Sequence, residues 1–181
     1  MGYNLMGIGP VDLAAGCAFL KELNPDGSSM VSASLYCGNR PAFSPFRIFH
    51  VKGIRIAVLG ISGGKAPSWI PNSDNVTIKD SDPAIERYMS KIAQNADMIV
   101  LLSSMPASME ARFMARHPGI ALVISSSRTA PTYTPVKHGG ALTVSTHPRG
   151  KSVGIIRLYL KRDQAGHYTV DHYNNRIYML E

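Results

Sequence analysis

The sequence predicts an α/β domain in which helices flank sheets that combine parallel and antiparallel strands. Strand-like and helix-like segments alternate through the middle of the chain, an order that places the strands parallel in one sheet. Two of these segments, 97–103 and 120–124, are apolar runs typical of strands buried on both faces. The segments beyond residue 140 are mainly strand-like, which predicts an antiparallel part.

The size and composition of the chain are those of one folded domain. It has 181 residues, of which 45% are hydrophobic and 17% charged, so a single domain over 1–181 is expected. No apolar stretch is long enough to cross a membrane, and the first residues lack the pattern of a signal peptide. The two cysteines, Cys17 and Cys37, are compatible with one disulfide or with two buried thiols.

The formal net charge of +7 raises the question of an anionic partner. Lysines and arginines are spread thinly, and no aromatic residues are interleaved with them as a stacking surface for bases would need. Nucleic acid is therefore not expected as a partner, whereas phosphate-bearing small molecules stay open.

Turn-forming residues delimit the elements of the first half. Asp12 is expected as the N-cap of a helix that ends at Leu23, because apolar residues between them recur on one face. Lys52-Gly53 joins an alternating strand to a more buried one, which predicts a hairpin. The expected elements are an apolar strand at 5–9, a helix at 12–23, a strand at 30–36, a loop at 38–45, and strands at 46–51 and 54–61.

The second half opens with an irregular stretch, 62–82, that is rich in Gly, Pro, Ser and Asn. Asp82-Pro83 then starts a helix, with Asp as N-cap and Pro at the first helical position. Pro118-Gly119 ends the next helix. The expected elements are helices at 82–95 and 107–117 and strands at 97–103, 120–124, 141–146, 153–160 and 168–179.

Functional residues of parallel α/β sheets lie in loops just beyond the carboxyl ends of the strands. The loops to inspect are therefore those after Gly9, Ile61, Ser103, Ile124 and Thr146.

The residues in and before these loops resemble one family. Gly2 to Gly16 is similar to the block around the Gly-Asn-His-Glu/Asp motif of 5′-nucleotidase-type metallophosphoesterases, the calcineurin-like phosphoesterases. Further matches follow in the order of that family's blocks, and the likeness spans residues 2 to 162. They are Ser32 to Leu35, Pro45 to Ile48, Lys52 to Ile61, Asp97 to Met105, Ile120 to Thr129 and Gly150 to Gly154. The resemblance implies layered β-sheets flanked by helices.

The resemblance also implies a centre of two divalent metals, but the positions of the ligands are changed. Pro10-Val11 stands where the family has Asn-His, and neither side chain offers a lone pair to a metal. Asp12 keeps an acidic group at the Glu/Asp position, where we expect it first as a helix N-cap. Ser104 replaces the His of a Ser-His motif.

The last motif of the family, His-x-His, corresponds to Ser127-Arg128-Thr129. Hydroxyls are poor ligands for such metals, and the positive charge of Arg128 opposes metal binding. The expectation is therefore that no metal or other cofactor is bound, the alternative being a divalent metal held by an altered ligand set. Ser125, Ser126, Arg128 and His147 are the residues expected to bind an anion instead.

The family carries further metal ligands upstream of the block at which this chain begins. We therefore expect the domain to lack the family's first strands, either because the sequence is a segment of a longer protein or because the natural protein lacks them, and another chain could supply a strand in their place.

Three functions remain at this point. The preferred one is a catalytically degenerate phosphoesterase-like domain that binds or scaffolds a partner. The alternatives are a metal-dependent hydrolase of phosphate esters such as nucleotides, and an assembly subunit that pairs through an open sheet edge. The resemblance implies a periplasmic or extracellular location, because enzymes of this family are commonly exported.

Overall fold

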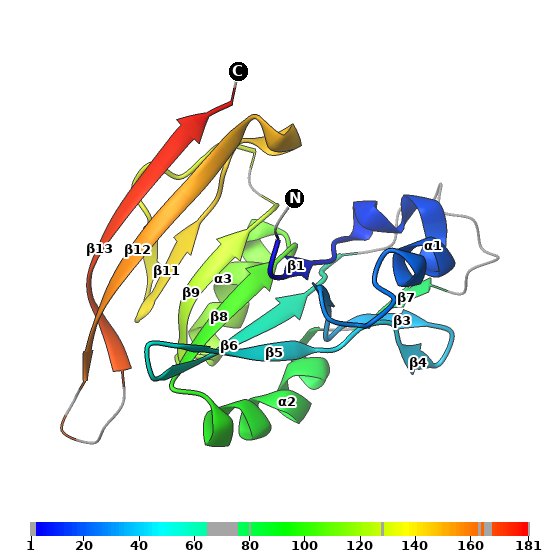
Figure 1. Ribbon diagram of the computed structural model, residues 1–181, viewed down its shortest axis with the longest axis horizontal. Helices are drawn as coiled ribbons and strands as arrows, with labels where there is room; N and C mark the ends of the chain where they lie inside the picture. Colours follow the sequence, from blue (N-terminus) through cyan, green and yellow to red (C-terminus); the bar gives the residue numbers. More distant parts are fainter. Residues whose placement is uncertain are drawn as a thin grey trace.

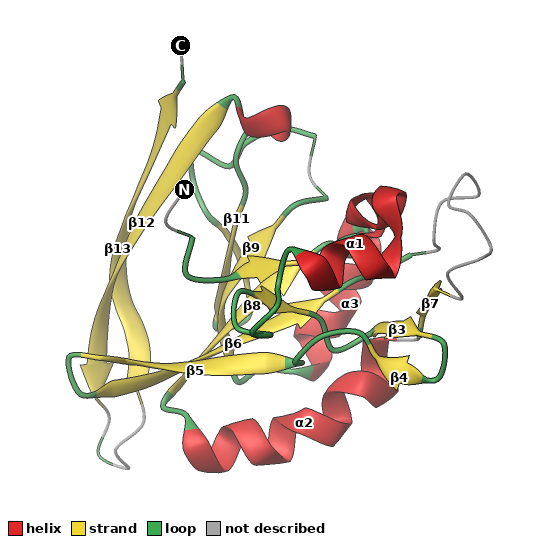
Figure 2. Cartoon of the chain, turned by 45° about the vertical axis from the view of Figure 1, so that its right-hand side comes forward, coloured by secondary structure: helices red, strands yellow, loops and turns green. Residues whose placement is uncertain are grey.

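The fold consists of three layers and a small N-terminal unit (Figure 1). The computed structural model describes residues 3–64, 76–79, 81–127, 129–162, 164 and 168–180. A six-stranded sheet forms the centre, helices α2 (Ser81–Asn95) and α3 (Ala107–Arg116) cover one face, and a two-stranded ribbon covers the other (Figure 2). The predicted α/β class with flanking helices is confirmed.

The central sheet has the strand order β10-β11-β9-β8-β6-β5. Four adjacent strands, β11, β9, β8 and β6, run parallel, while β5 and β10 pair antiparallel at the two edges. The mixed sheet predicted from the sequence is thus confirmed. The bounds are Phe46–Val51 for β5, Ile54–Ile61 for β6, Met98–Ser103 for β8, Ile120–Ser125 for β9, Val136–His138 for β10 and Ala141–Val144 for β11.

Strand β8 shows why the sequences of the central strands are continuous apolar runs. Ile99 and Leu101 pack with residues of α2 and α3, whereas Met98 and Val100 pack on the opposite face. Successive side chains of a strand point to opposite faces. Because both faces are covered, five of the six positions are buried, and Leu102 is partly exposed.

The covering layer on the second face is a ribbon of β12 (Ser152–Arg162) and β13 (Tyr168–Met179), which pair antiparallel. Leu158 and Tyr173 are among the ribbon residues that pack on the central sheet. Both strands were predicted, β12 with its ends at 153 and 160.

The N-terminal unit, residues 3–45, differs most from the prediction. The single helix expected over 12–23 is a 3-10 helix, η1 (Pro10–Ala15), followed by α1 (Gly16–Glu22). Gly16 has φ 81 and ψ 168, a conformation that interrupts a helix and that suits glycine. Asp12 is therefore not an N-cap: it lies at the third position of η1, and its carboxylate accepts a hydrogen bond from the backbone N–H of Gly9 at 2.8 Å.

The strand predicted over 30–36 is also divided. β2 (Met30–Val31) pairs in parallel with β1 (Met6–Gly7), while β3 (Leu35–Cys37) belongs to another sheet with β4 (Arg40–Pro41) and β7 (Val76–Ile78). Between β2 and β3 the hydroxyls of Ser32 and Ser34 bond to Ser62 instead of continuing one strand. Strands β4 and β7 lie in segments predicted to be irregular, and β10 was not predicted.

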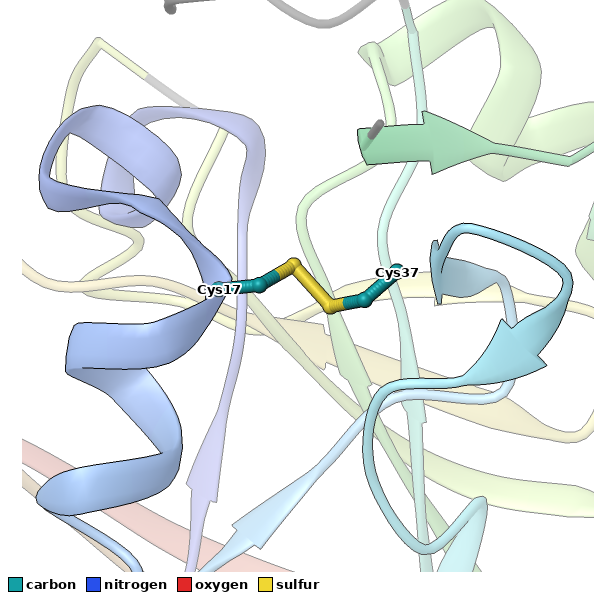
Figure 3. The surroundings of a disulfide bond; sticks show 2 residues. All are labelled: Cys17 and Cys37. Atoms are coloured by element: carbon teal, nitrogen blue, oxygen red, sulfur yellow. A yellow bond between two sulfur atoms is a disulfide. The ribbon is translucent and has the colours of Figure 1, made fainter. Parts of the chain in front are cut away.

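A disulfide between Cys17 and Cys37 joins α1 to the end of β3 (Figure 3). The two Cα atoms are 6.3 Å apart. The structure thus selects the first of the two alternatives that the sequence left open. Among the described helices none is long and apolar enough to span a membrane, in line with the prediction.

Candidate functional site

Four parallel strands bring their carboxyl ends to one edge of the central sheet. Ser62 follows β6, Ser104 follows β8, Ser126 follows β9, and Thr146 comes just after β11. The backbone joins these ends, since the N–H of Ser104 donates to the carbonyl of Ile61 at 3.0 Å and that of Ser126 to the carbonyl of Ser103 at 2.8 Å. Four of the loops singled out in the sequence, those after Ile61, Ser103, Ile124 and Thr146, therefore lie at this edge.

The segment around β1 lies against this edge. A Cβ placed on Gly7 would be 2.8 Å from the Cβ of Leu102, and one on Gly9 would be 3.2 Å from the Cβ of Ser104. A side chain at position 7 would force Leu102 to move, and one at position 9 would fit only if Ser104 shifted slightly, so the β1 segment lies close against the end of β8. The same Cβ on Gly9 would lie 3.5 Å from the carboxylate of Asp12, so Asp12 and Ser104 flank one glycine.

A buried cluster of serine hydroxyls fastens the β1 segment to β6. The Oγ of Ser62 donates to the carbonyl oxygen of Ile8 at 2.5 Å and lies 2.8 Å from the Oγ of Ser32. The Oγ of Ser34 donates to the carbonyl of Ser62 at 2.7 Å and accepts from its N–H at 2.9 Å. All three serines are buried. Their hydroxyls are used between segments of the chain and are not presented to a ligand.

A hollow of about 640 Å³ opens beside these strand ends. Ser104, Ser125 and Ser126, all named from the sequence, contribute to its lining. Much of the wall is apolar, and Met6 and Ile124 are 40% and 42% exposed. The sequence prediction missed the other lining residues, which are Tyr3, Leu5, Met6, Gly7, Ile8, Leu102, Ser103, Ile124, Thr146 and Gly150.

The missed residues lacked a chemical signal. Met6 and Ile124 belong to runs that read as ordinary strands, and a sequence does not show that their ends leave apolar side chains uncovered. Thr146 could have been predicted as a lining residue, because it ends the strand predicted at 141–146.

The remaining candidates lie outside the lining of the hollow. Pro10 is half-buried, and Val11, Asp12, Ser127 and Thr129 are exposed. The Oγ atoms of Ser125 and Ser127 are 3.3 Å apart. Arg128 lies outside the described residues, so its part in an anion site stays a prediction.

His147 is engaged elsewhere. Its Nδ1 lies 3.0 Å from the Oγ of Ser152, and its ring makes an edge-on contact with that of Tyr133 at a centroid distance of 6.2 Å. The structure therefore does not bring His147 together with Ser125 and Ser126 in the wall of the hollow.

The donors that the structure describes at the strand ends do not fit a centre of two metals. They are mainly serine hydroxyls and backbone groups, and the carboxylate of Asp12 is bonded to Gly9. Within the described parts of the chain, no three His, Cys, Asp or Glu side chains are grouped so that they could hold a metal ion. A metal-dependent hydrolase normally draws on imidazole and carboxylate ligands.

The three-layered arrangement around a mixed sheet is shared with solved structures of a calcineurin-like phosphoesterase, a sulfate thiohydrolase and a 5′-nucleotidase precursor. A calcineurin-like phosphoesterase, YfkN, from Bacillus subtilis superimposes with a TM-score of 0.81 at 16% identity, covering 98% of this chain and 64% of its own. The sulfate thiohydrolase SoxB of Thermus thermophilus, in complex with glycerol, gives 0.79 at 22% identity over 93% of this chain and 31% of its own. A 5′-nucleotidase precursor from the same organism gives 0.77 at 19% identity over 98% of this chain and 39% of its own.

At these identities the likeness establishes the fold. This chain spans less than two thirds of the length of each of the three proteins. No family model and no curated protein matches the sequence.

Proposed function

We propose that this chain is a catalytically degenerate 5′-nucleotidase-like domain that acts as a binding or scaffold module. The observation that carries the proposal is the donor set at the strand ends. Pro10-Val11, Ser104 and Ser127 stand where the resemblance expects metal ligands, and the hydroxyl of Ser104 is directed to a backbone carbonyl, that of Ile61. Metal ions generate the attacking hydroxide in such hydrolases at neutral pH, and the described residues at these ends do not supply a ligand set for them.

The proposed ligand of the strand ends is a small anion. Ser125 and Ser126 lie together in the wall of the hollow, and Arg128 adjoins them in the sequence. Hydroxyls and a guanidinium are donors that suit phosphate or carboxylate oxygens. His147 is a weaker candidate, because its ring contacts Ser152 and Tyr133.

The test combines metal analysis with turnover and binding. The purified chain should contain no stoichiometric divalent metal, and with manganese, zinc or calcium it should release no phosphate above blank from a panel of phosphate esters. In calorimetric titrations with inorganic phosphate, Arg128→Ala should weaken binding about tenfold, while Arg87→Ala on the exposed side of α2 should leave it unchanged.

The alternative is a hydrolase that uses an altered ligand set. It is favoured by the match to a 5′-nucleotidase precursor over 98% of this chain, since that protein contains further residues beyond the matched part. Phosphate release that a chelator abolishes would establish this alternative and refute the degenerate domain. An unaltered phosphate affinity in Arg128→Ala would refute the anion site alone.

We propose an oxidising location, periplasmic or extracellular, for the domain. The proposal is supported by the Cys17–Cys37 disulfide, because such bonds persist outside the reducing cytosol. Alkylation of the native-source protein without reductant, followed by mass spectrometry, should find both thiols blocked by the bond. Two alkylated cysteines would contradict the proposal.

A further inference from the structure

The outer face of the β12–β13 ribbon combines apolar and cationic side chains. Side chains of a strand alternate between faces, so the residues next to those packed on the central sheet point outward. Val153, Ile155, Tyr159 and Tyr178 on this face are 45% to 47% exposed. The cross-strand pairs of the face are Val153–Tyr178, Ile155–Arg176, Arg157–Asn174, Tyr159–His172 and Lys161–Thr169.

Positively charged residues outnumber negatively charged ones on this ribbon. Its two strands carry four basic residues and one acidic residue, Asp171, whose carboxylate is 2.9 Å from the Nδ1 of His172. Arg157, Lys161 and Arg176 have no carboxylate opposite them in the cross-strand pairs. A surface of this kind favours a partner that presents carboxylates together with apolar groups.

The unpaired edges of the ribbon indicate that the partner is a polypeptide strand. Among the described strands, β12 and β13 pair only with each other, over 11 and 12 residues. At about 3.3 Å per residue, each leaves roughly 35 Å of strand edge without a neighbouring strand. Figure 1 shows β13 at the outer margin of the molecule. Backbone N–H and C=O groups along such an edge pair with another polypeptide strand.

We infer that the β12–β13 ribbon is a docking surface for an extended, acidic polypeptide segment that adds a strand to one of its edges. Nucleic acids and lipid headgroups share the negative charge but lack the repeating backbone donors and acceptors that match a strand edge. A second copy of this chain is disfavoured, because it would place a basic face against a basic face. The surface does not depend on the proposed anion site, which lies at the strand ends of the central sheet.

The test uses a fluorescent peptide about ten residues long in which glutamate and valine alternate, a length typical of a strand. Fluorescence anisotropy should show binding to the chain, and a peptide with lysine in place of glutamate should not bind. Methylating alternate backbone nitrogens of the acidic peptide should weaken binding about tenfold, because the donors to the strand edge are lost.

Variants of the chain locate the surface. Arg157→Glu combined with Arg176→Glu should weaken binding of the acidic peptide about tenfold. The matched control, Lys21→Glu with Lys91→Glu, makes the same change in net charge at exposed positions of α1 and α2 and should leave binding within about twofold. If the charge-reversed variant fails to fold by circular dichroism, Arg157→Gln with Arg176→Gln should weaken binding in the same direction.

Several results would overturn the inference. One is no binding of the acidic peptide, and another is equal binding of its N-methylated form, which would leave electrostatic attraction without strand addition. Tighter binding of a thymidine oligonucleotide, or of vesicles containing phosphatidylserine, would assign the surface to a different class of partner. Equal weakening in the α1–α2 control variant would place the surface elsewhere.

Discussion

The two ends of the central sheet treat polar residues in different ways. At the amino end, Arg55 near the start of β6 and Asp97 just before β8 form a charged pair, with Nη2 and Oδ1 2.8 Å apart. At the carboxyl end the polar side chains that join the strands are neutral serines, and their hydroxyls bond to each other or to backbone carbonyls. Among the described residues, an ion pair thus joins strands at the amino end, where function is not expected in this fold, and neutral hydroxyls join them at the carboxyl end, where function is expected.

The use of neutral serines at the carboxyl end indicates that these residues hold segments of the chain together. A catalytic edge requires donors that are held in place yet left free for a ligand. Here Ser32, Ser34 and Ser62 are fully used in attaching the β1 and β2 segments to β6. The strand ends therefore support packing of the N-terminal unit, and Ser104, Ser125 and Ser126 are the described serines outside this cluster that border the hollow.

The largest expected effect comes from breaking this packing at Gly60. A Cβ at Gly60 would be 2.4 Å from the carbonyl oxygen of Val31, a backbone atom that cannot yield without moving β2. Gly60→Ala should therefore lower the free energy of unfolding by about 3 kcal/mol, as overpacking in a core does. Urea denaturation followed by circular dichroism measures it.

The control is Gly119→Ala, where the added Cβ would have no described atom within 4 Å. Its free energy of unfolding should change by less than about 0.5 kcal/mol. If the two variants unfolded at the same urea concentration, β2 would not lie in close contact with β6. The carboxyl end of the sheet would then not be built around this packing.

The central sheet and the helices on it could be predicted because their signals are local. Apolar runs indicate β8 and β9, and the helices predicted at 82–95 and 107–117 are observed at Ser81–Asn95 and Ala107–Arg116. The break between β2 and β3 could not be predicted, because it depends on bonds from Ser32 and Ser34 to Ser62, about thirty residues away. Short strands such as β10 depend on their neighbours, which a sequence pattern does not show.

The sequence predicted where the candidate site lies, but it did not predict which side chains line it. The loops after β8 and β9 were identified because parallel strands end together, and Ser104, Ser125 and Ser126 do border one hollow. The engagement of His147 with Ser152 and the position of Asp12 inside η1 require three-dimensional contacts. The pairing of Cys17 with Cys37 likewise needed the fold, because two cysteines alone leave the choice between thiols and a bond open.

The amino end of the sheet gives the smaller effect and sharpens the comparison. Hydrogen bonds from the guanidinium and the backbone N–H of Arg55 hold the pKa of Asp97 at about 2, below its usual value. A carboxylate whose folded pKa is lowered contributes stability above its unfolded pKa, about 3.9, and loses that contribution as the pH falls through its folded pKa. The relevant window is therefore from about pH 4 down to pH 2.

Replacing Asp97 by Asn should lower the free energy of unfolding at pH 6 by about 1 kcal/mol, a reduced value because the side chains of Arg55 and Asp97 are 43% and 22% exposed. The difference between the wild-type chain and the variant should shrink as the pH is lowered from 4 to 2, since protonated Asp97 no longer attracts Arg55. Urea denaturation at pH 6, 4 and 2.5 measures it, with Glu22→Gln at an exposed position of α1 as the control. A difference that stays constant across these pH values would mean that the charge of Asp97 does not stabilise the fold, and the amino end of the sheet would then resemble the carboxyl end in relying on neutral hydrogen bonds.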